Sequence, residues 1–161
     1  MSFDESKYRK GYSIGVGGVV IHNGEVLLVR RIRGEDLGEW AIPGGFVEKN
    51  EKADKAIIRE VLEETGVKAR VKGLIAIRNR IYKDENSIYL MFLLETDIEE
   101  LKAQKSEVDK VGFFNLSQVN GISNLQTLSK IVVEKVLKNE HKLLPYINQD
   151  DFPDSEYGIF G

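Results

Sequence analysis

The sequence predicts an α/β (α+β) fold, in which β-strands and helices form one domain. Three observations lead to this prediction: several apolar runs of strand length, an Asn-Gly pair between two of them, and two segments whose apolar residues recur at helical spacing. The chain has 161 residues, which is typical of a single domain, here expected to extend over residues 1–161. Its 42% of hydrophobic and 30% of charged residues are the balance of a globular protein, not of a disordered one.

The first predicted element is a β-hairpin. Residues 12–21 and 25–31 are rich in β-branched and aliphatic side chains, as strands usually are. Asn23-Gly24 stands between them, and this pair is the strongest short signal for a two-residue turn. The polar, glycine-containing segment 32–39 that follows is expected to be a loop.

A helix over residues 51–65 is expected next. Its apolar side chains lie on one arc when 3.6 residues make a turn, and the following Gly66 is suited to the position just past a helix end. These apolar residues are Ile57, Ile58, Val61 and Leu62.

Three further strands are predicted in the second half of the chain. Residues 67–80 are rich in β-forming residues with a break at Gly73, and residues 84–86 are expected to turn the chain. Residues 87–95 are apolar on both faces, which is typical of a central, buried strand. Residues 111–114 are expected to form the last of these strands.

A second helix is predicted from a capping box. Ser123 and Gln126 have the spacing of such a box, and the apolar periodicity that follows extends to about Lys138. This helix is expected to pack on the core, and its exposed side is a candidate contact of a homodimer. Residues 139–161 are expected to form an irregular tail.

The composition excludes several classes of function. Without cysteine the chain cannot form disulfides, thiolate zinc sites or a cysteine nucleophile. Its 23 basic and 26 acidic residues give a net charge of −3, which argues against a nucleic-acid binder. The N-terminus lacks the apolar region of a signal peptide, and no stretch approaches the ~20 apolar residues that span a bilayer. We therefore expect a cytoplasmic protein without membrane contact.

Three glutamates on the first helix indicate a metal site. Glu60, Glu63 and Glu64 stand at positions i, i+3 and i+4, so they share one helix face, where like charges repel. Hard divalent cations, which prefer oxygen ligands, are the expected reason for such a cluster. The carbonyl of Gly44, in the loop before the helix, is a candidate further ligand. Arg59 is expected to hold a carboxylate in a forked pair. Its candidate partners are Glu63, Glu48 and Glu51.

Residues 45–67 resemble the Nudix box, G-x5-E-x7-R-E-U-x-E-E-x-G-U, in which U is an aliphatic residue. All nine specified positions are filled. They are Gly45, Glu51, Arg59, Glu60, Val61, Glu63, Glu64, Gly66 and Val67. So long a spaced pattern rarely arises by chance, which makes the resemblance specific. The resemblance extends over roughly residues 12–138 and does not include the tail.

The resemblance implies a Nudix fold, a mixed sheet sandwiched between helices in which the box is a loop–helix–loop. It also implies hydrolysis of a pyrophosphate bond in a nucleoside diphosphate linked to another moiety. In that family, residues matching Glu60, Glu63 and Glu64 bind Mg²⁺ or Mn²⁺ together with the carbonyl that matches Gly44.

A further metal-binding glutamate usually comes from a loop before a late strand in that family. Glu107 is the positional candidate, and Asp109 is its competitor. Clustered cations neutralise phosphate oxygens and lower the pKa of bound water, which a carboxylate can then deprotonate. Glu60 is the first choice for this base, with Glu63 and Glu107 as alternatives. The predicted catalytic group is Glu60, Glu63, Arg59 and Glu107.

Arginines near the expected cleft are candidates to bind the substrate. Arg30, Arg31 and Arg33 lie at the end of the second strand, and Arg78 and Arg80 share one face of a later strand because they are two positions apart. Their guanidinium groups are suited to phosphates.

Three aromatic residues, Trp40, Tyr82 and Tyr89, are candidates to stack on a base, and Trp40 fits a place in the core as well. The segment 44–48, GGFVE, resembles Nudix members that cleave ADP-ribose, so an ADP-ribose-like substrate is favoured. A proline that those members often carry beyond the box is missing, which keeps ordinary or oxidised nucleoside triphosphates as the alternative. A non-catalytic nucleotide-sensing module is the alternative from another class, although such modules usually lose box carboxylates.

Overall fold

The computed structural model describes residues 11–82, 84–97, 100–104, 106–147 and 159–161, without the side chain of Tyr82. It confirms a fold that combines strands and helices. In chain order, the elements are β1 (Tyr12–His22), β2 (Glu25–Arg31), β3 (Trp40–Ala41), β4 (Gly44–Phe46), α2 (Ala53–Thr65), β5 (Arg70–Tyr82), β6 (Glu85–Glu95), β7 (Val108–Phe114), α3 (Leu116–Gly121), α4 (Thr127–Leu137), β8 (Leu144–Ile147) and β9 (Ile159–Phe160).

The strands form a mixed sheet with the order β3-β2-β1-β6-β5-β8-β9, in which β4 also pairs with β1 and β7 also pairs with β2. β1 and β6 run parallel from the Tyr12–Asn86 pair to the Ile21–Glu95 pair. The other named strand pairs in the described residues are antiparallel. β6 lies between β1 and β5, as predicted for a central strand.

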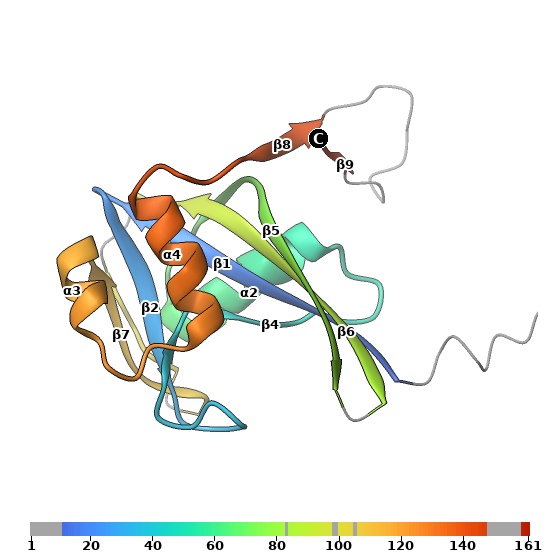
Figure 1. The fold of residues 1–161 in the computed structure, drawn as a ribbon, viewed down its shortest axis with the longest axis horizontal. Coiled ribbons are helices and arrows are strands. Elements are labelled where there is room, and N and C mark those ends of the chain that lie inside the picture. Colours follow the sequence, from blue (N-terminus) through green and yellow to red (C-terminus); the bar gives the residue numbers. More distant parts are fainter. Residues whose placement is uncertain (1–10, 83, 98–99, 105, 148–158) are drawn as a thin grey trace, which may run out of the picture.

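Helices cover both faces of the sheet, as the resemblance implies (Figure 1). α2 packs on the face that carries Val16 and Val20 of β1, whereas α4 packs on the opposite face, which carries Val19. The sheet therefore separates two hydrophobic clusters, and α2 is held beside the strands that line the site. Of the helices in the described ranges, none is long and apolar enough to cross a membrane.

Local sequence signals set several element boundaries. Asn23 and Gly24 have φ angles of 48° and 80°, the left-handed pair that a two-residue hairpin turn requires. Gly66 ends α2 with a φ angle of 74°, as predicted for a residue past a helix end. The buried side of α2 differs from the predicted apolar arc, because Leu62 is 42% exposed while Glu64 is completely buried. Hydrophobic periodicity alone therefore misplaced part of this helix surface.

The predicted capping box at Ser123 and Gln126 is wrong. Gln126 stands just before α4, but no side-chain hydrogen bond caps that helix. The side-chain Nε2 of Gln126 instead donates to the Asp36 carboxylate at 2.7 Å. A capping box does form one element earlier, where Asn115 and Gln118 exchange hydrogen bonds at the start of α3. The sequence prediction did not include α3.

The C-terminal tail contains two strands and is not wholly irregular. β8 pairs with β5 through Leu144 and Pro145, and β9 pairs with β8. Phe160 of β9 packs edge-on against Phe92 of β6, with ring centroids 5.4 Å apart. The tail therefore extends the sheet and adds to the hydrophobic cluster on the α2 side.

Candidate active site

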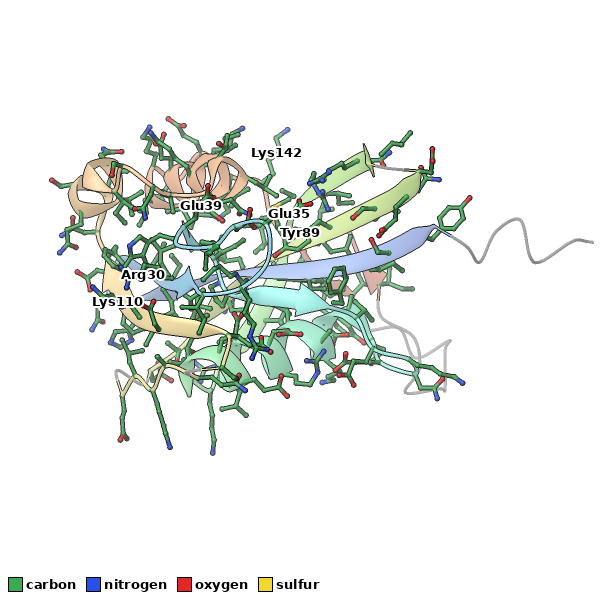
Figure 2. The ribbon with its side chains drawn as sticks, turned by 90° about the horizontal axis from the view of Figure 1, so that it is seen from below. Arg30, Glu35, Glu39, Tyr89, Lys110 and Lys142 are labelled. Atoms are coloured by element: carbon green, nitrogen blue, oxygen red, sulfur yellow. The ribbon has the colours of Figure 1, made fainter. Side chains whose placement is uncertain are left out.

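A cleft of about 1160 Å³ opens between the sheet and the loop that joins β2 to β3. Its other walls come from β4, the middle of α2 and the paired strands β5 and β6. Figure 2 shows the β2–β3 loop, with Glu35 and Glu39, close to Tyr89 of β6. The cleft connects the predicted metal site on α2 with the predicted arginines on β5.

Glycines of β4 allow close contact between this strand and the glutamates of α2. A Cβ atom on Gly45 would lie 2.6 Å from the carboxyl carbon of Glu60, so a larger residue would displace that carboxylate. Glu60 is only 8% exposed, and its neighbour one turn later, Glu64, is completely buried. The box therefore places two carboxylates inside the protein, of which Glu60 lines the cleft and Glu64 lies buried beneath the surface.

The buried Glu64 lies beside Gly44 and Arg31. Its carboxylate accepts a hydrogen bond from the Gly44 amide at 2.9 Å and forms an ion pair with the Arg31 guanidinium. Arg31 also donates to the Gly44 carbonyl at 2.8 Å. Burial raises the pKa of Glu64 to about 7, and the charge of Arg31 opposes this rise. The Arg31 guanidinium thus lies between two oxygens that were predicted to bind a cation.

Arg59 connects the other glutamates of the box. Its Nε and Nη2 atoms donate to the two oxygens of Glu51 at 2.8 Å each, which makes Glu51 the forked partner. Its Nη1 atom donates to Glu60 at 2.8 Å and to Glu63 at 3.2 Å. Glu48 contributes its backbone amide, which donates to Glu51 at 3.0 Å. One guanidinium therefore fixes three carboxylates that would otherwise repel one another.

The two box carboxylates bound to Arg59 Nη1 differ in exposure. Glu60 lines the cleft, whereas the side chain of Glu63 is 50% exposed. Burial raises the pKa of Glu60, Arg59 opposes this rise, and the charges of Glu63 and Glu107 add to it. Glu107 is thus close enough to Glu60 to affect its ionisation.

The structure separates Glu107 from its competitor Asp109. Glu107 lines the cleft just before β7, and its carbonyl accepts a hydrogen bond from the Ile32 amide at 2.9 Å. Asp109 instead forms a forked ion pair with Arg30, whose Nε atom donates at 2.8 Å. This arrangement favours Glu107 as the acidic residue that faces the box helix.

The cleft contains part of the predicted substrate-binding set. Its lining includes Arg31, Arg78 and Arg80. Arg80 of β5 lies 3.9 Å from the carboxylate of Glu35, so the β2–β3 loop and β5 present opposite charges within the cleft. The side chain of Tyr82 lies outside the described residues.

Two predicted substrate-binding residues, Arg30 and Trp40, are not among the residues that line the cleft. Arg30 pairs with Lys110 in the β2–β7 ladder, and Figure 2 shows the two side by side. Trp40 packs edge-on against Phe114, with ring centroids 5.0 Å apart, in the hydrophobic cluster on the α4 side. The structure therefore does not bring these two side chains to the site.

The β2–β3 loop contributes residues that the sequence did not single out. Its Asp36 accepts a hydrogen bond from Gln126, and its Gly38 carbonyl accepts one from Asn124, both at 2.7 Å. These contacts hold the loop to the segment before α4. Because the partners are far apart in the chain, no local sequence signal could have identified them.

The chemistry of the donor set fits a hard divalent cation. Gly44 offers a carbonyl oxygen, and Glu60 and Glu64 offer carboxylate oxygens, which are the ligands that Mg²⁺ and Mn²⁺ prefer. Within the described ranges, no group of three acidic or histidine side chains converges closely enough to hold an ion as it stands. Arg31 and Arg59 bind these oxygens instead, so a cation would replace positive charge that the protein itself supplies.

The burial of Glu64 predicts a pH dependence of stability in metal-free protein. Its pKa is about 7 in the fold against an ordinary value of 4.5, so the folded state binds more protons than the unfolded state between these pH values. This group should therefore make the free energy of unfolding fall as the pH rises from about 4.5 to about 7. Thermal unfolding in EDTA across this range measures the fall, and Glu64→Gln should reduce it. An identical pH profile in the variant would contradict the expected protonation.

Comparisons with known proteins find a matching family model and similar sequences. A family model described as the NUDIX domain matches residues 11–136. A relative named ADP-ribose pyrophosphatase, from Methanocaldococcus jannaschii, is 32% identical over 120 residues, which are 72% of this chain and 70% of the relative. A relative named nucleoside diphosphate-linked moiety X motif 6, from Xenopus laevis, is 27% identical over 157 residues, or 92% of this chain and 72% of the relative.

Solved structures share the fold. The NUDIX domain of Shewanella oneidensis NrtR, solved in complex with ADP ribose, matches with a TM-score of 0.72 and 21% identity. The match covers 85% of this chain and 93% of that domain. At this identity the likeness concerns the architecture, a mixed sheet with a few helices.

Proposed function

This chain belongs to the Nudix hydrolase family, and we propose that it hydrolyses the pyrophosphate bond of an ADP-ribose-like nucleoside diphosphate derivative with the help of Mg²⁺ or Mn²⁺. Membership rests on the family match over residues 11–136 and on the 32% identical relative. As a Nudix pyrophosphohydrolase, the protein acts on nucleoside diphosphates linked to a further moiety. The identity of that moiety is the new part of the proposal.

The position of α2 at the cleft is the observation that supports this function most. Gly45 permits Glu60 to reach the cleft wall, and Gly44 lies against the buried Glu64. A divalent cation bound there would neutralise phosphate oxygens and lower the pKa of a bound water. The proposed ligands are the Gly44 carbonyl and the carboxylates of Glu60, Glu63, Glu64 and Glu107.

We assign the general base to Glu60. This carboxylate lines the cleft beside the other proposed cation ligands, where it can accept a proton from a bound water. Arg59 donates a hydrogen bond to it at 2.8 Å and so orients it. Glu63 and Glu107 are the alternatives. A Gln substitution at each of the three positions would rank these candidates by how far each variant lowers the rate of substrate hydrolysis at high pH.

An ADP-ribose-like substrate is favoured by the relative named ADP-ribose pyrophosphatase and by the NrtR domain that was solved with ADP ribose. The cleft has groups suited to such a molecule. Arg31 lies near the proposed cation ligands, where a phosphate would come. The ring of Phe46 lines the cleft and is 66% exposed, so it is available to stack on a base.

A substrate panel tests the proposal. The panel comprises ADP-ribose, dinucleotides, nucleotide sugars, and ordinary and oxidised nucleoside triphosphates, each with Mg²⁺, with Mn²⁺ and with EDTA. We expect ADP-ribose or a close analogue to have the highest kcat/KM, with AMP as a product and no turnover in EDTA. Preference for a triphosphate would favour the alternative substrate class. Tight binding without any product under all conditions would indicate a sensing module.

A further inference from the structure

Tyr89 fills a space beside the site that three glycines leave open. A Cβ atom on Gly15 would lie 2.6 Å from the Cδ2 atom of Tyr89, and one on Gly17 would lie 2.6 Å from its Cε1 atom. A Cβ atom on Gly44 would lie 2.7 Å from the Tyr89 hydroxyl. Real Cβ atoms do not approach so closely, so these glycines admit the ring. The hydroxyl end of the ring therefore lies next to Gly44, a proposed cation ligand.

Arg78 lies over the ring of Tyr89. The two residues are directly paired across β5 and β6, so their side chains are on the same face of the sheet. The guanidinium carbon is 5.5 Å from the ring centroid, a cation–π arrangement, and Nη2 donates to the Ser87 hydroxyl at 2.9 Å. These two contacts fix the orientation of Arg78 in the cleft. With glycines on one side and Arg78 on the other, the Tyr89 ring is poorly placed to stack on a base.

The charge of Arg78 lacks a counter-ion within the described part of the chain. Arg31 and Arg59 bind glutamates, and Arg30 binds Asp109, whereas Arg78 has Ser87 and the Tyr89 ring as its polar partners. The Nε–H group of Arg78 is also buried without a hydrogen-bond acceptor. Burial and the nearby charge of Arg80 lower the pKa of Arg78, which is the expected result of an uncompensated site.

We propose that Arg78, oriented by Tyr89, binds a phosphate oxygen of the diphosphate bridge of the substrate. An anionic oxygen would supply both the missing counter-charge and the missing hydrogen-bond acceptor, whereas a base stacked on the guanidinium would supply neither. Tyr89 acts as a positioning residue. Its ring supports the guanidinium through the cation–π contact. This inference rests on the proposed function for the identity of the ligand.

Equilibrium binding tests the inference without dependence on turnover. Calorimetric titrations with ADP and with adenosine, both in EDTA, compare the parent protein with Arg78→Gln. We expect the Kd for ADP to rise about 30-fold, because a hydrogen bond between charged groups is lost, while the Kd for adenosine stays within about twofold. Arg78→Lys, which keeps the charge but not the planar guanidinium, should lose less affinity for ADP.

Arg70→Gln is the matched control. Arg70 is on the same strand but outside the cleft, where it pairs with Asp97 and Glu95, so its loss removes an equal charge and should leave ADP binding as in the parent. Tyr89→Leu removes the ring and should weaken ADP binding as Arg78→Gln does. Thermal unfolding of each variant shows whether the fold is retained.

Several outcomes would overturn the inference. They are an absence of ADP binding by the parent, an unchanged Kd for ADP in Arg78→Gln, and an equal loss of ADP and adenosine affinity, which would indicate base stacking. A parent that hydrolyses nothing in the substrate panel, yet loses ADP affinity through Arg78→Gln, would refute the proposed function and leave the phosphate subsite in place.

Discussion

Glu64→Gln is expected to reduce the rate at which the pyrophosphate bond of the substrate is hydrolysed about 1,000-fold at saturating Mg²⁺. The amide side chain preserves the size of Glu64 and can still accept a hydrogen bond from Gly44, but it removes the negative charge that a cation requires. Arg31 also loses its ion-pair partner. The rate of monophosphate release from the best substrate of the panel measures the effect, and thermal unfolding shows whether the fold is intact.

Glu134→Gln is the matched control for this prediction. Glu134 lies on α4, where it forms ion pairs with Lys130 and Lys138, and it does not line the cleft. This variant should hydrolyse the substrate at the rate of the parent. If Glu64→Gln also kept the parent rate, Glu64 would have no part in the proposed cation site.

Arg59→Met is expected to lower turnover about 100-fold, because Arg59 orients the box carboxylates that we propose as cation ligands. Its removal also leaves Glu51, Glu60 and Glu63 without their shared guanidinium. We expect the free energy of unfolding to fall by about 2 kcal/mol, since partly buried charged groups lose hydrogen bonds. Steady-state kinetics at excess Mg²⁺ and chemical denaturation in EDTA measure the two effects.

Arg59→Lys separates the charge of this residue from its geometry. Lysine keeps a positive charge, but it cannot donate to both oxygens of Glu51 as the guanidinium does, so turnover should recover only in part. Full activity in Arg59→Met, with the fold intact, would show that the carboxylates hold their places without Arg59.

The box and its helix were predictable because their signals are local. Helical spacing places Glu60 and Glu64 on adjacent turns of one helix, and Gly66 marks its end within the same stretch of sequence. The tight glycine contacts are also close in sequence to the glutamates that they accommodate. These parts of the site follow from residues 44–67 alone.

Other parts of the site depend on how distant segments meet. Arg30 and Arg31 are neighbours in the sequence, yet alternation along β2 directs Arg30 to Asp109 and Arg31 to Glu64. Which of the two arginines would enter the site depends on the register of β2 with β7, and this pairing leaves no local signal. The position of Trp40 was likewise not predictable, because its contact with Phe114 joins two segments that are far apart in the sequence.

Only some of the contacts that position Arg78 in the proposed phosphate subsite could be predicted from the sequence. The spacing of Arg78 and Arg80 predicted a shared strand face, and both residues line the cleft. The association of Arg78 with Tyr89 depends on the β5–β6 register, and the space for Tyr89 depends on glycines in β1 and β4. A glycine-rich strand indicates close packing, but it does not identify the ring that occupies the space.

Anomalous X-ray scattering from crystals grown with saturating Mn²⁺ is the most direct test of whether residues 44–67 bind a divalent cation. We predict a peak at about 2.1 Å from the Gly44 carbonyl oxygen and from a carboxylate oxygen of Glu64, with Arg31 moved away from both. Peaks confined to other parts of the molecule, with Arg31 still bound to Glu64, would contradict this site.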